Sequence, residues 1–319
     1  MTLSYNLNNN NSLSHLSKSI LKTLAYYDIF SYPLTDEEIF RCTNTNGHSK
    51  EKVFDELNYL ASNKIINFKD GFYFINHDHQ IIEKRIDGNK RAENKMKTAR
   101  KFSKFISYFP YVRGIALSGS ISKGYMDSKA DIDYFIITEP NRLWIARIFL
   151  VFFKKIFLFN SYKLFCINYF VSTVNLEIEE KNIYTAIELA TLIPTYGAEI
   201  YTNIQKANGW IKNFIPNYPE YDTTTIPATK RKITQIIIES LLNNKLGDYL
   251  DNKVMKLFIR YDEKRYGKLD EEIFKLAFKT RRNVSKHHPN FFQKRVLDTL
   301  KEKLEQLELK HNIALSEVE

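Results

Sequence analysis

The sequence predicts a multidomain α+β protein. Two apolar segments, around 114–118 and 132–138, are rich in β-branched or aromatic residues and predict neighbouring strands of one sheet. Long stretches before and after them repeat apolar residues at helical spacing. With 319 residues, 44% of them hydrophobic and 14% aromatic, the chain is long enough for roughly two or three compact units.

The N-terminal region predicts a disordered lead-in and then a small domain. Residues 1–14 are polar and Asn-rich, without an apolar run of signal-peptide length. Residues 15–80 predict three helices, the second capped by Thr35 with acids in its first turn. Asp70-Gly71, flanked by alternating apolar residues, predicts a β-hairpin. Three helices and a hairpin of this length resemble a winged-helix domain.

The winged-helix resemblance raises DNA binding as a role. The third predicted helix, 49–64, carries three lysines but also Glu51, Asp55 and Glu56. A helix that reads a DNA groove should be basic on its outer face. This mixture favours an intramolecular packing module or a protein-interaction module, with DNA as the less favoured partner.

Residues 81–110 predict one long basic helix that connects this domain to the next, interrupted or kinked near Asp87-Gly88. A charge run of this kind is usually a solvated face. The alternative is that Arg91 or Lys95 lines the approach to a bound phosphate group. Pro110 ends the helix before the first strand of the next domain.

The segment 114–138 carries the residues that point to chemistry. Gly119-Ser120 follows an apolar strand and opens a short helix, where free backbone N–H groups favour an anion such as phosphate. Asp131 and Asp133 lie two residues apart at the next strand, so both carboxylates project from the same side. Two converging carboxylates favour a bound cation, and their hard oxygen atoms suit Mg²⁺. The pattern predicts phosphoryl or nucleotidyl transfer; its alternative is an Asp-Ile-Asp that merely caps a strand.

Leu117-Ser118-Gly119-Ser120 and Asp131-Ile132-Asp133-Tyr134, separated by the spacer 121–130, resemble the signature of the polymerase-β-like nucleotidyltransferase superfamily. The resemblance implies a catalytic core with a mixed sheet over residues 111–215. It implies that Gly119 and Ser120 hold the β- and γ-phosphates of a nucleoside triphosphate, with Lys123 neutralising part of its charge. Asp131 and Asp133 would then bind two Mg²⁺ ions.

Active members of this superfamily usually place a third acid on a later strand. The best candidate strand is 163–172, which contains no acid, and Asn168 is its only amide within the apolar run. Asn168 is therefore the candidate third-acid position, although a neutral amide cannot act as a base. Glu177 and Glu179 follow closely and are the alternative, unless they lie in an exposed strand end or turn.

The remaining chain predicts helices. Residues 143–159 form an amphipathic pattern interrupted by cations and too short for a membrane span, which favours packing on the sheet over a membrane-surface helix. Further helices are expected near 184–201, 232–250, 252–261, 269–278 and 291–309. Residues 216–319 thus predict a C-terminal helical domain, of the kind that helps to form the acceptor site in small-molecule nucleotidyltransferases. The basic cluster 279–289 predicts a surface loop, with phosphate binding as the alternative.

Together these features predict a Mg²⁺-dependent nucleotidyltransferase that moves a nucleoside monophosphate from a nucleoside triphosphate to a hydroxyl of a small molecule. The alternative is a catalytically weak nucleotide-binding regulator whose winged helix contacts DNA or a partner protein. The net charge of +10 suits anionic partners but equally fits a Lys- and Asn-rich composition. Two isolated cysteines, Cys42 and Cys166, exclude a zinc-finger site and predict a cytoplasmic protein. The shortness of the apolar runs predicts that the protein has no membrane partner.

Overall fold

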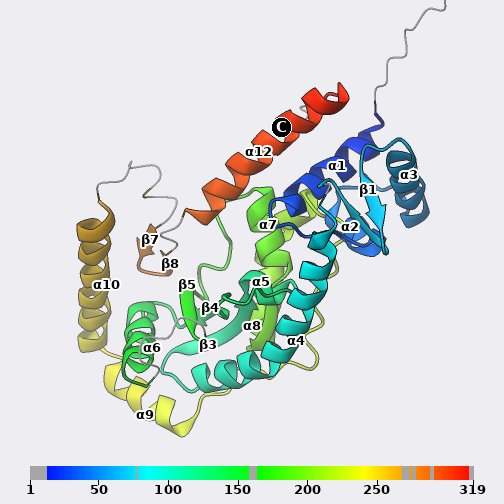
Figure 1. Ribbon diagram of the computed structural model, residues 1–319. Coiled ribbons are helices and arrows are strands. Elements are labelled where there is room, and N and C mark those ends of the chain that lie inside the picture. Colours follow the sequence, from blue (N-terminus) through cyan, green and yellow to red (C-terminus); the bar gives the residue numbers. More distant parts are fainter. Residues whose placement is uncertain are drawn as a thin grey trace, which may run out of the picture. The chain divides into compact units, whose positions relative to one another are not determined.

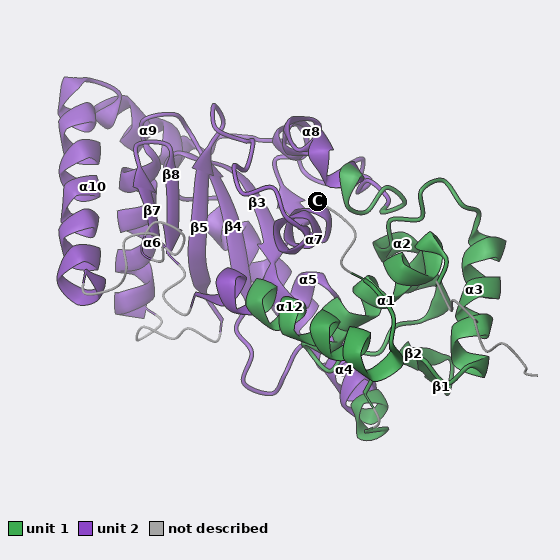
Figure 2. Ribbon diagram, turned by 90° about the horizontal axis from the view of Figure 1, so that it is seen from above, with its two compact units in different colours: residues 1–83, 213–218, 296–319 green, residues 84–212, 219–295 purple. Residues whose placement is uncertain are grey.

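The computed structural model describes residues 13–76, 78–157, 164–267, 274, 278–287 and 291–315. The chain forms two compact units built from interleaved segments (Figure 2). Unit 1 comprises residues 1–83, 213–218 and 296–319, and unit 2 comprises residues 84–212 and 219–295. Most of the predicted N-terminal lead-in, residues 1–12, lies outside the described residues.

Unit 1 contains the three helices and the hairpin that the sequence predicts. These are α1 (His15–Asp28), α2 (Asp36–Cys42), α3 (Lys50–Ser62), β1 (Asn67–Lys69) and β2 (Phe72–Phe74). Thr35 caps α2 reciprocally, because its hydroxyl accepts from the Glu38 backbone N–H while the Glu38 carboxylate accepts from the Thr35 N–H. Asp70 and Gly71 both have positive φ, as a tight hairpin turn requires.

Unit 2 is organised around a six-stranded mixed sheet with the order β6-β3-β4-β5-β8-β7. The β4 and β5 strands are parallel, and every other neighbouring pair in this sheet is antiparallel. The α+β class and the mixed sheet agree with the sequence-based prediction. The strands are β3 (Val112–Ser118), β4 (Asp133–Thr138), β5 (Cys166–Ser172), β6 (Ile193–Tyr196), β7 (Phe278–Arg281) and β8 (Val284–His287).

Helices cover both faces of this sheet (Figure 1). One face packs against α4 (Gln80–Ile106) and α6 (Leu143–Phe157), with Tyr134 of β4 and Ile132 just before that strand in the core. The other face packs against α7 (Ile183–Ala190) and α8 (Ala198–Ala207). The α6 helix packs on the sheet, as its pattern predicts, and α4 is one continuous helix through Gly88 rather than an interrupted one.

The C-terminal region differs from the predicted domain of helices alone. It contains α9 (Ile233–Leu242) and α10 (Lys245–Tyr266), but 278–287 form the hairpin β7–β8 at the edge of the main sheet instead of the predicted loop. Most of the helix predicted over 269–278 lies outside the described residues. The last helix, α12 (Phe292–His311), agrees with its prediction.

Two predicted helices are each divided. The segment 184–201 becomes α7, the strand β6 and α8, because Pro194 and the positive φ of Gly197 separate the two helices. The segment 232–250 ends one helix at Leu242 and begins the next after its N-cap Asn244. The short elements α5 (Gly119–Ser122) and a 3₁₀ helix (Gly209–Asn213) complete the fold. Among the described helices, none is long and apolar enough to cross a membrane.

Candidate active site

The Gly119-Ser120 turn lies directly against the Asp133 carboxylate. Ser118, the last residue of β3, pairs with Asp133, the first residue of β4, across an antiparallel ladder. Gly119 follows with φ +68°, and a Cβ atom at this position would overlap Asp133 Oδ2. Gly119 is thus required both by its left-handed backbone and by the closeness of the carboxylate. The Gly119-Ser120 turn and Asp133 therefore form one structural feature.

The short helix α5 is fixed by its own side chains. The Ser122 hydroxyl donates to the Gly119 carbonyl oxygen at 2.9 Å, and Lys123 Nζ donates to the same oxygen at 3.1 Å. Lys123 also forms an ion pair with Glu188 of α7 at 2.8 Å. Lys123, which is predicted to contact a triphosphate, therefore lies at the turn, where its ammonium group is paired with the Glu188 carboxylate. The first backbone N–H groups of α5, including that of Ser120, have no partner within so short a helix.

Asp131 and Asp133 have different environments. Asp133 opens β4, whereas Asp131 lies in the loop before the strand. Burial, together with the negative charges of Asp131 and Glu188, raises the pKa of Asp133 to about 6. A hydrogen bond with Cys166 and the positive charge of Lys123 oppose this rise in the pKa. The site therefore carries an excess of negative charge around a partly buried carboxyl group.

The spacer between the two halves of the motif is bound to α4. The Met126 N–H donates to the Gly88 carbonyl oxygen at 3.0 Å, and Arg91 Nε donates to the Met126 carbonyl oxygen at 2.8 Å. A Cβ atom at position 88 would overlap the Tyr125 ring, which explains a glycine inside a long helix. Arg91, one of the two residues in the alternative phosphate-binding interpretation, holds the loop that leads to Asp131. The structure shows no such role for Lys95.

Asn168, the candidate third-acid position, lies on β5 beside the strand that begins with Asp133. Asp133 pairs with Cys166 and Phe135 pairs with Tyr169, so β5 contains one extra residue between these pairs, a β-bulge that includes Asn168. Its amide Nδ2 lies 2.8 Å from Cys166 Sγ. An amide and a thiol thus occupy the part of β5 beside Asp133.

The two alternative acids are paired elsewhere. Glu177 forms an ion pair with Lys181 at 2.8 Å. Glu179 pairs with Lys279 and Arg281 of β7 at 2.9 and 2.6 Å. Both glutamates lie in the segment after β5. This agrees with the interpretation that they belong to an exposed strand end or turn. The basic cluster 279–289 thus uses part of its charge within the protein.

Sequence reasoning missed two charged residues of the site. Glu188 approaches from α7 and contributes to the raised pKa of Asp133. Lys154 lies on the sheet-facing side of α6 and is only 6% exposed; burial lowers the pKa of its ammonium group, and the charge of Asp131 opposes that effect. Each is a charged residue inside an apolar helical run, and this pattern in the sequence could have indicated a buried charge near the site.

Asp131 and Asp133 are the residues that could hold a magnesium ion with few protein ligands. Within the described residues, no group of three or more His, Cys, Asp or Glu side chains is arranged to hold a metal. Mg²⁺ often takes only one or two protein carboxylates and completes its shell with water and substrate phosphates. A cation at Asp131 and Asp133 would also stabilise the ionised form of Asp133, whose pKa burial has raised.

Comparisons of the chain with models of protein families, with curated proteins and with solved structures give no match. Three observations bear on the function of this site. The Gly119 turn packs on the Asp133 carboxylate, and the charge of Asp131 acts on the same carboxylate. The Lys123 ammonium group donates to the Gly119 carbonyl oxygen, and its charge also acts on Asp133.

Proposed function

We propose that this protein transfers a nucleoside monophosphate from a nucleoside triphosphate to a hydroxyl group of a small molecule and releases pyrophosphate. The observation that supports this proposal best is the packing of the Gly119 backbone against Asp133. It brings the tight turn that opens α5 against the Asp133 carboxylate, two residues after Asp131 in the sequence. A phosphate-binding turn beside a metal site requires such closeness.

Each residue of the site has a role in this proposal. The backbone of Gly119 and Ser120 would bind the β- and γ-phosphates, and Lys123 would turn from Glu188 toward them. Asp131 and Asp133 would hold Mg²⁺, which supplies neutralisation of the triphosphate charge when bound. With a pKa of about 6, Asp133 is mostly ionised at neutral pH and able to bind a cation. Asp133 is therefore in the form that the proposal requires.

A second candidate function has its own support in Asn168. A neutral amide cannot accept the proton of an attacking hydroxyl, so a site with Asn168 in the third position is suited to binding more than to turnover. The protein would then be a nucleotide-binding regulator, with the three helices and hairpin of unit 1 as its partner-binding module. The partner of this regulator would be DNA or another protein.

Pyrophosphate release separates the two candidates. We would measure release from each of the four ribonucleoside triphosphates with Mg²⁺ and a pool of small metabolites, and triphosphate binding separately. Release that is lost in the double variant Asp131→Ala/Asp133→Ala supports the transferase. Triphosphate binding without release supports the regulator.

Asp127→Ala is the matched control for this experiment. Asp127 is an exposed acid of the same loop, bonded only locally through the Tyr125 hydroxyl at 2.8 Å. Its removal lowers the net negative charge of the loop without touching the aspartate pair. Equal loss of release in the control and the double variant would count against a specific metal site.

A further inference from the structure

The helix α9 buries polar residues and exposes apolar ones, which is the opposite of the usual arrangement in an amphipathic helix. Its buried residues include Gln235 and Glu239, which are 0% and 4% exposed. Its outward side carries four large aliphatic residues at positions i, i+3, i+4 and i+8, which share one face of a helix. These residues are Ile233, Ile236, Ile237 and Leu241, with exposed fractions of 77%, 47%, 54% and 67%. We call these four residues the α9 apolar face.

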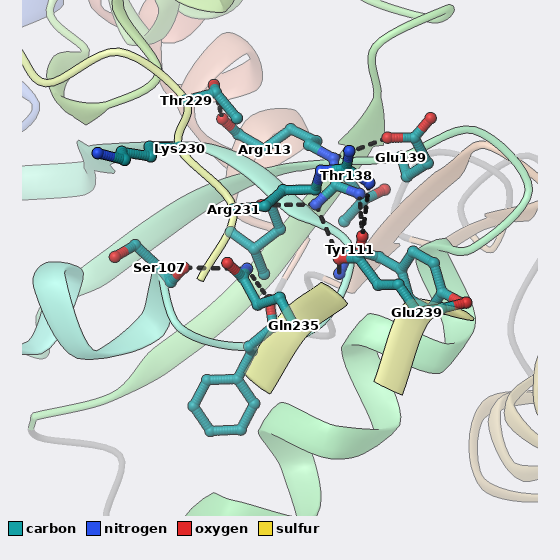
Figure 3. Close-up of polar contacts among 12 residues, drawn as sticks. Ser107, Tyr111, Arg113, Thr138, Glu139, Thr229, Lys230, Arg231, Gln235 and Glu239 are labelled. Carbon is teal, nitrogen blue, oxygen red and sulfur yellow. Dashed lines mark hydrogen bonds and ion pairs between the residues drawn. The ribbon is translucent and has the colours of Figure 1, made fainter. Parts of the chain in front are cut away.

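Buried polar contacts fix this orientation. Gln235 Nε2 donates to the backbone carbonyl oxygens of Ser107 and Phe109 at 3.1 and 2.7 Å (Figure 3). The Glu239 carboxylate accepts from the Tyr111 N–H at 2.7 Å and from both terminal nitrogens of Arg113 at 2.9 and 2.8 Å (Figure 3). Rotation of α9 would separate the buried Glu239 carboxylate from its partners and leave the buried Arg113 guanidinium group with Glu139, an exposed acid. The isoleucines are therefore held outward by the fold.

Cations border the α9 apolar face at both ends. Lys230 and Arg231 are exposed before the helix, and Lys245 is exposed after it. Lys232 lies over the ring of Tyr108, at 5.3 Å from its centroid, and Tyr108 is itself 42% exposed. Glu239, the acid within α9, is buried. The outer surface here therefore combines aliphatic side chains with positive charge.

We propose that the α9 apolar face binds peripherally to a membrane surface that contains anionic lipids. Aliphatic residues would enter the acyl boundary while the flanking lysines and arginine contact lipid phosphates, the arrangement of an interfacial amphipathic helix. A second copy packed antiparallel on α9 would bring the cations at one end against the cations at the other, which disfavours self-association. The mode requires no spanning helix and does not depend on the proposed catalytic function.

The sequence predicts no membrane partner, because that expectation considers only the length of apolar runs. The α9 apolar face is a different feature: a short row of isoleucines on a helix whose polar residues are buried. Hydrophobic periodicity marks such a row as core and cannot show that it points outward. Only the buried contacts of Gln235 and Glu239 reveal the direction.

Vesicle co-sedimentation of the full chain tests the proposal. We expect binding to phosphatidylcholine vesicles that contain phosphatidylglycerol, little binding to phosphatidylcholine alone, and weaker binding as salt is raised. The triple variant Ile233→Ser/Ile237→Ser/Leu241→Ser should bind these vesicles at least about tenfold more weakly than the wild type. The variant Lys230→Gln/Lys245→Gln should lose a comparable factor, because each basic residue near the surface contributes about fivefold.

Two controls make the outcomes decisive. Val174→Ser/Leu309→Ser removes aliphatic residues that are 66% and 85% exposed outside α9, and it should bind as the wild type does. All variants change exposed side chains, so the midpoint of thermal unfolding should stay within about 2 °C of the wild type. No binding to anionic vesicles at low salt, or equal binding by the wild type and the triple variant, overturns the proposal. A wild-type dimer that the triple variant converts to a monomer assigns the face to self-association instead.

Discussion

Gly119 is restricted by two separate features that a substitution can distinguish. Its φ of +68° is unfavourable for any residue with a Cβ atom, and its missing Cβ leaves space for the Asp133 carboxylate. Gly124, five residues later, has nearly the same φ of +69° but meets only Asn89 Nδ2, at 3.9 Å. The two glycines share the backbone restriction, and only Gly119 adds the close approach.

We therefore expect unequal effects from alanine at these positions. Gly124→Ala should lower the free energy of unfolding by about 1 kcal/mol and leave triphosphate binding nearly unchanged. Gly119→Ala should cost about 2–4 kcal/mol and abolish binding, because the added methyl group displaces the carboxylate. Denaturant unfolding and calorimetric titration with a triphosphate and Mg²⁺ check both. Similar binding by the two variants would argue against the turn as a phosphate site.

Asp133 should make the protein less stable at neutral pH than at acidic pH. Its folded pKa of about 6 exceeds the ordinary value of 3.8, because burial and the charges of Asp131 and Glu188 disfavour ionisation. Between these two pH values the folded state binds more protons than the unfolded state, so this contribution to stability falls as pH rises. Asp133→Asn should raise the free energy of unfolding at pH near 7 by about 2 kcal/mol, with less effect near pH 4.

Urea unfolding of wild type and Asp133→Asn across this pH range measures the difference. Asp251 of α10 also has a pKa raised by burial to about 6, so only the difference between the two proteins isolates Asp133. The same substitution should abolish Mg²⁺-dependent triphosphate binding. A variant that is destabilised equally at all pH values would show that Asp133 is structural rather than functional.

At the scale of elements, buried polar contacts decide where α9 lies. The Arg113 guanidinium group is bonded to Glu239 of α9 and to Glu139 beyond β4, and both pairs are short (Figure 3). Burial alone lowers the pKa of Arg113, but the hydrogen bonds and charges of the two glutamates outweigh it and raise the pKa. The Glu239 side chain is 6% exposed and that of Glu139 is 46% exposed.

This difference in exposure predicts a difference in stability. Glu239→Ala leaves a buried guanidinium group with one exposed partner, and should lower the free energy of unfolding by about 3–5 kcal/mol. Glu139→Ala removes the exposed partner of the same arginine and should cost about 1 kcal/mol or less. Chemical denaturation of both variants makes the comparison. Equal losses would mean that α9 is held mainly by other contacts.

At the scale of the whole molecule, unit 1 is completed by the C-terminal helix. Within this unit, Lys303 of α12 forms an ion pair with Asp28 at the end of α1. Leu307 and Leu315 are 5% and 1% exposed. The three helices and hairpin near the N-terminus thus share a unit with residues about 220 positions later in the sequence.

Removal of residues 296–319 should therefore loosen unit 1 more than unit 2. We expect faster amide hydrogen exchange in α1 after this truncation, with little change in β3 and β4. Removal of 316–319 alone is the control and should leave exchange in α1 unchanged. Equal exchange in the long truncation and the full chain would show that unit 1 folds without α12.

The sequence by itself determined the parts of this protein that depend on local signals. The cap at Thr35, the Asp70-Gly71 turn and the order of strand, Gly-Ser turn and second strand are all encoded by adjacent residues. The prediction that Asp131 also lies on the second strand is wrong, because that strand begins at Asp133. Local side-chain chemistry restricts the backbone there, whatever the rest of the chain does. The same holds for the faces of β4, where alternation separates Asp133 from Tyr134, which lies in the core.

Tertiary structure decided the features that require a distant partner. The strands β6, β7 and β8 have four residues each, too few for a periodic signal, and they exist because a sheet edge pairs with them. The approach of Glu188 and Lys154 to the aspartates follows from how α7 and α6 pack on the sheet. The outward direction of the α9 isoleucines follows from a buried ion pair with Arg113. Periodicity records which residues share a face, but only the partner of that face determines whether it is buried.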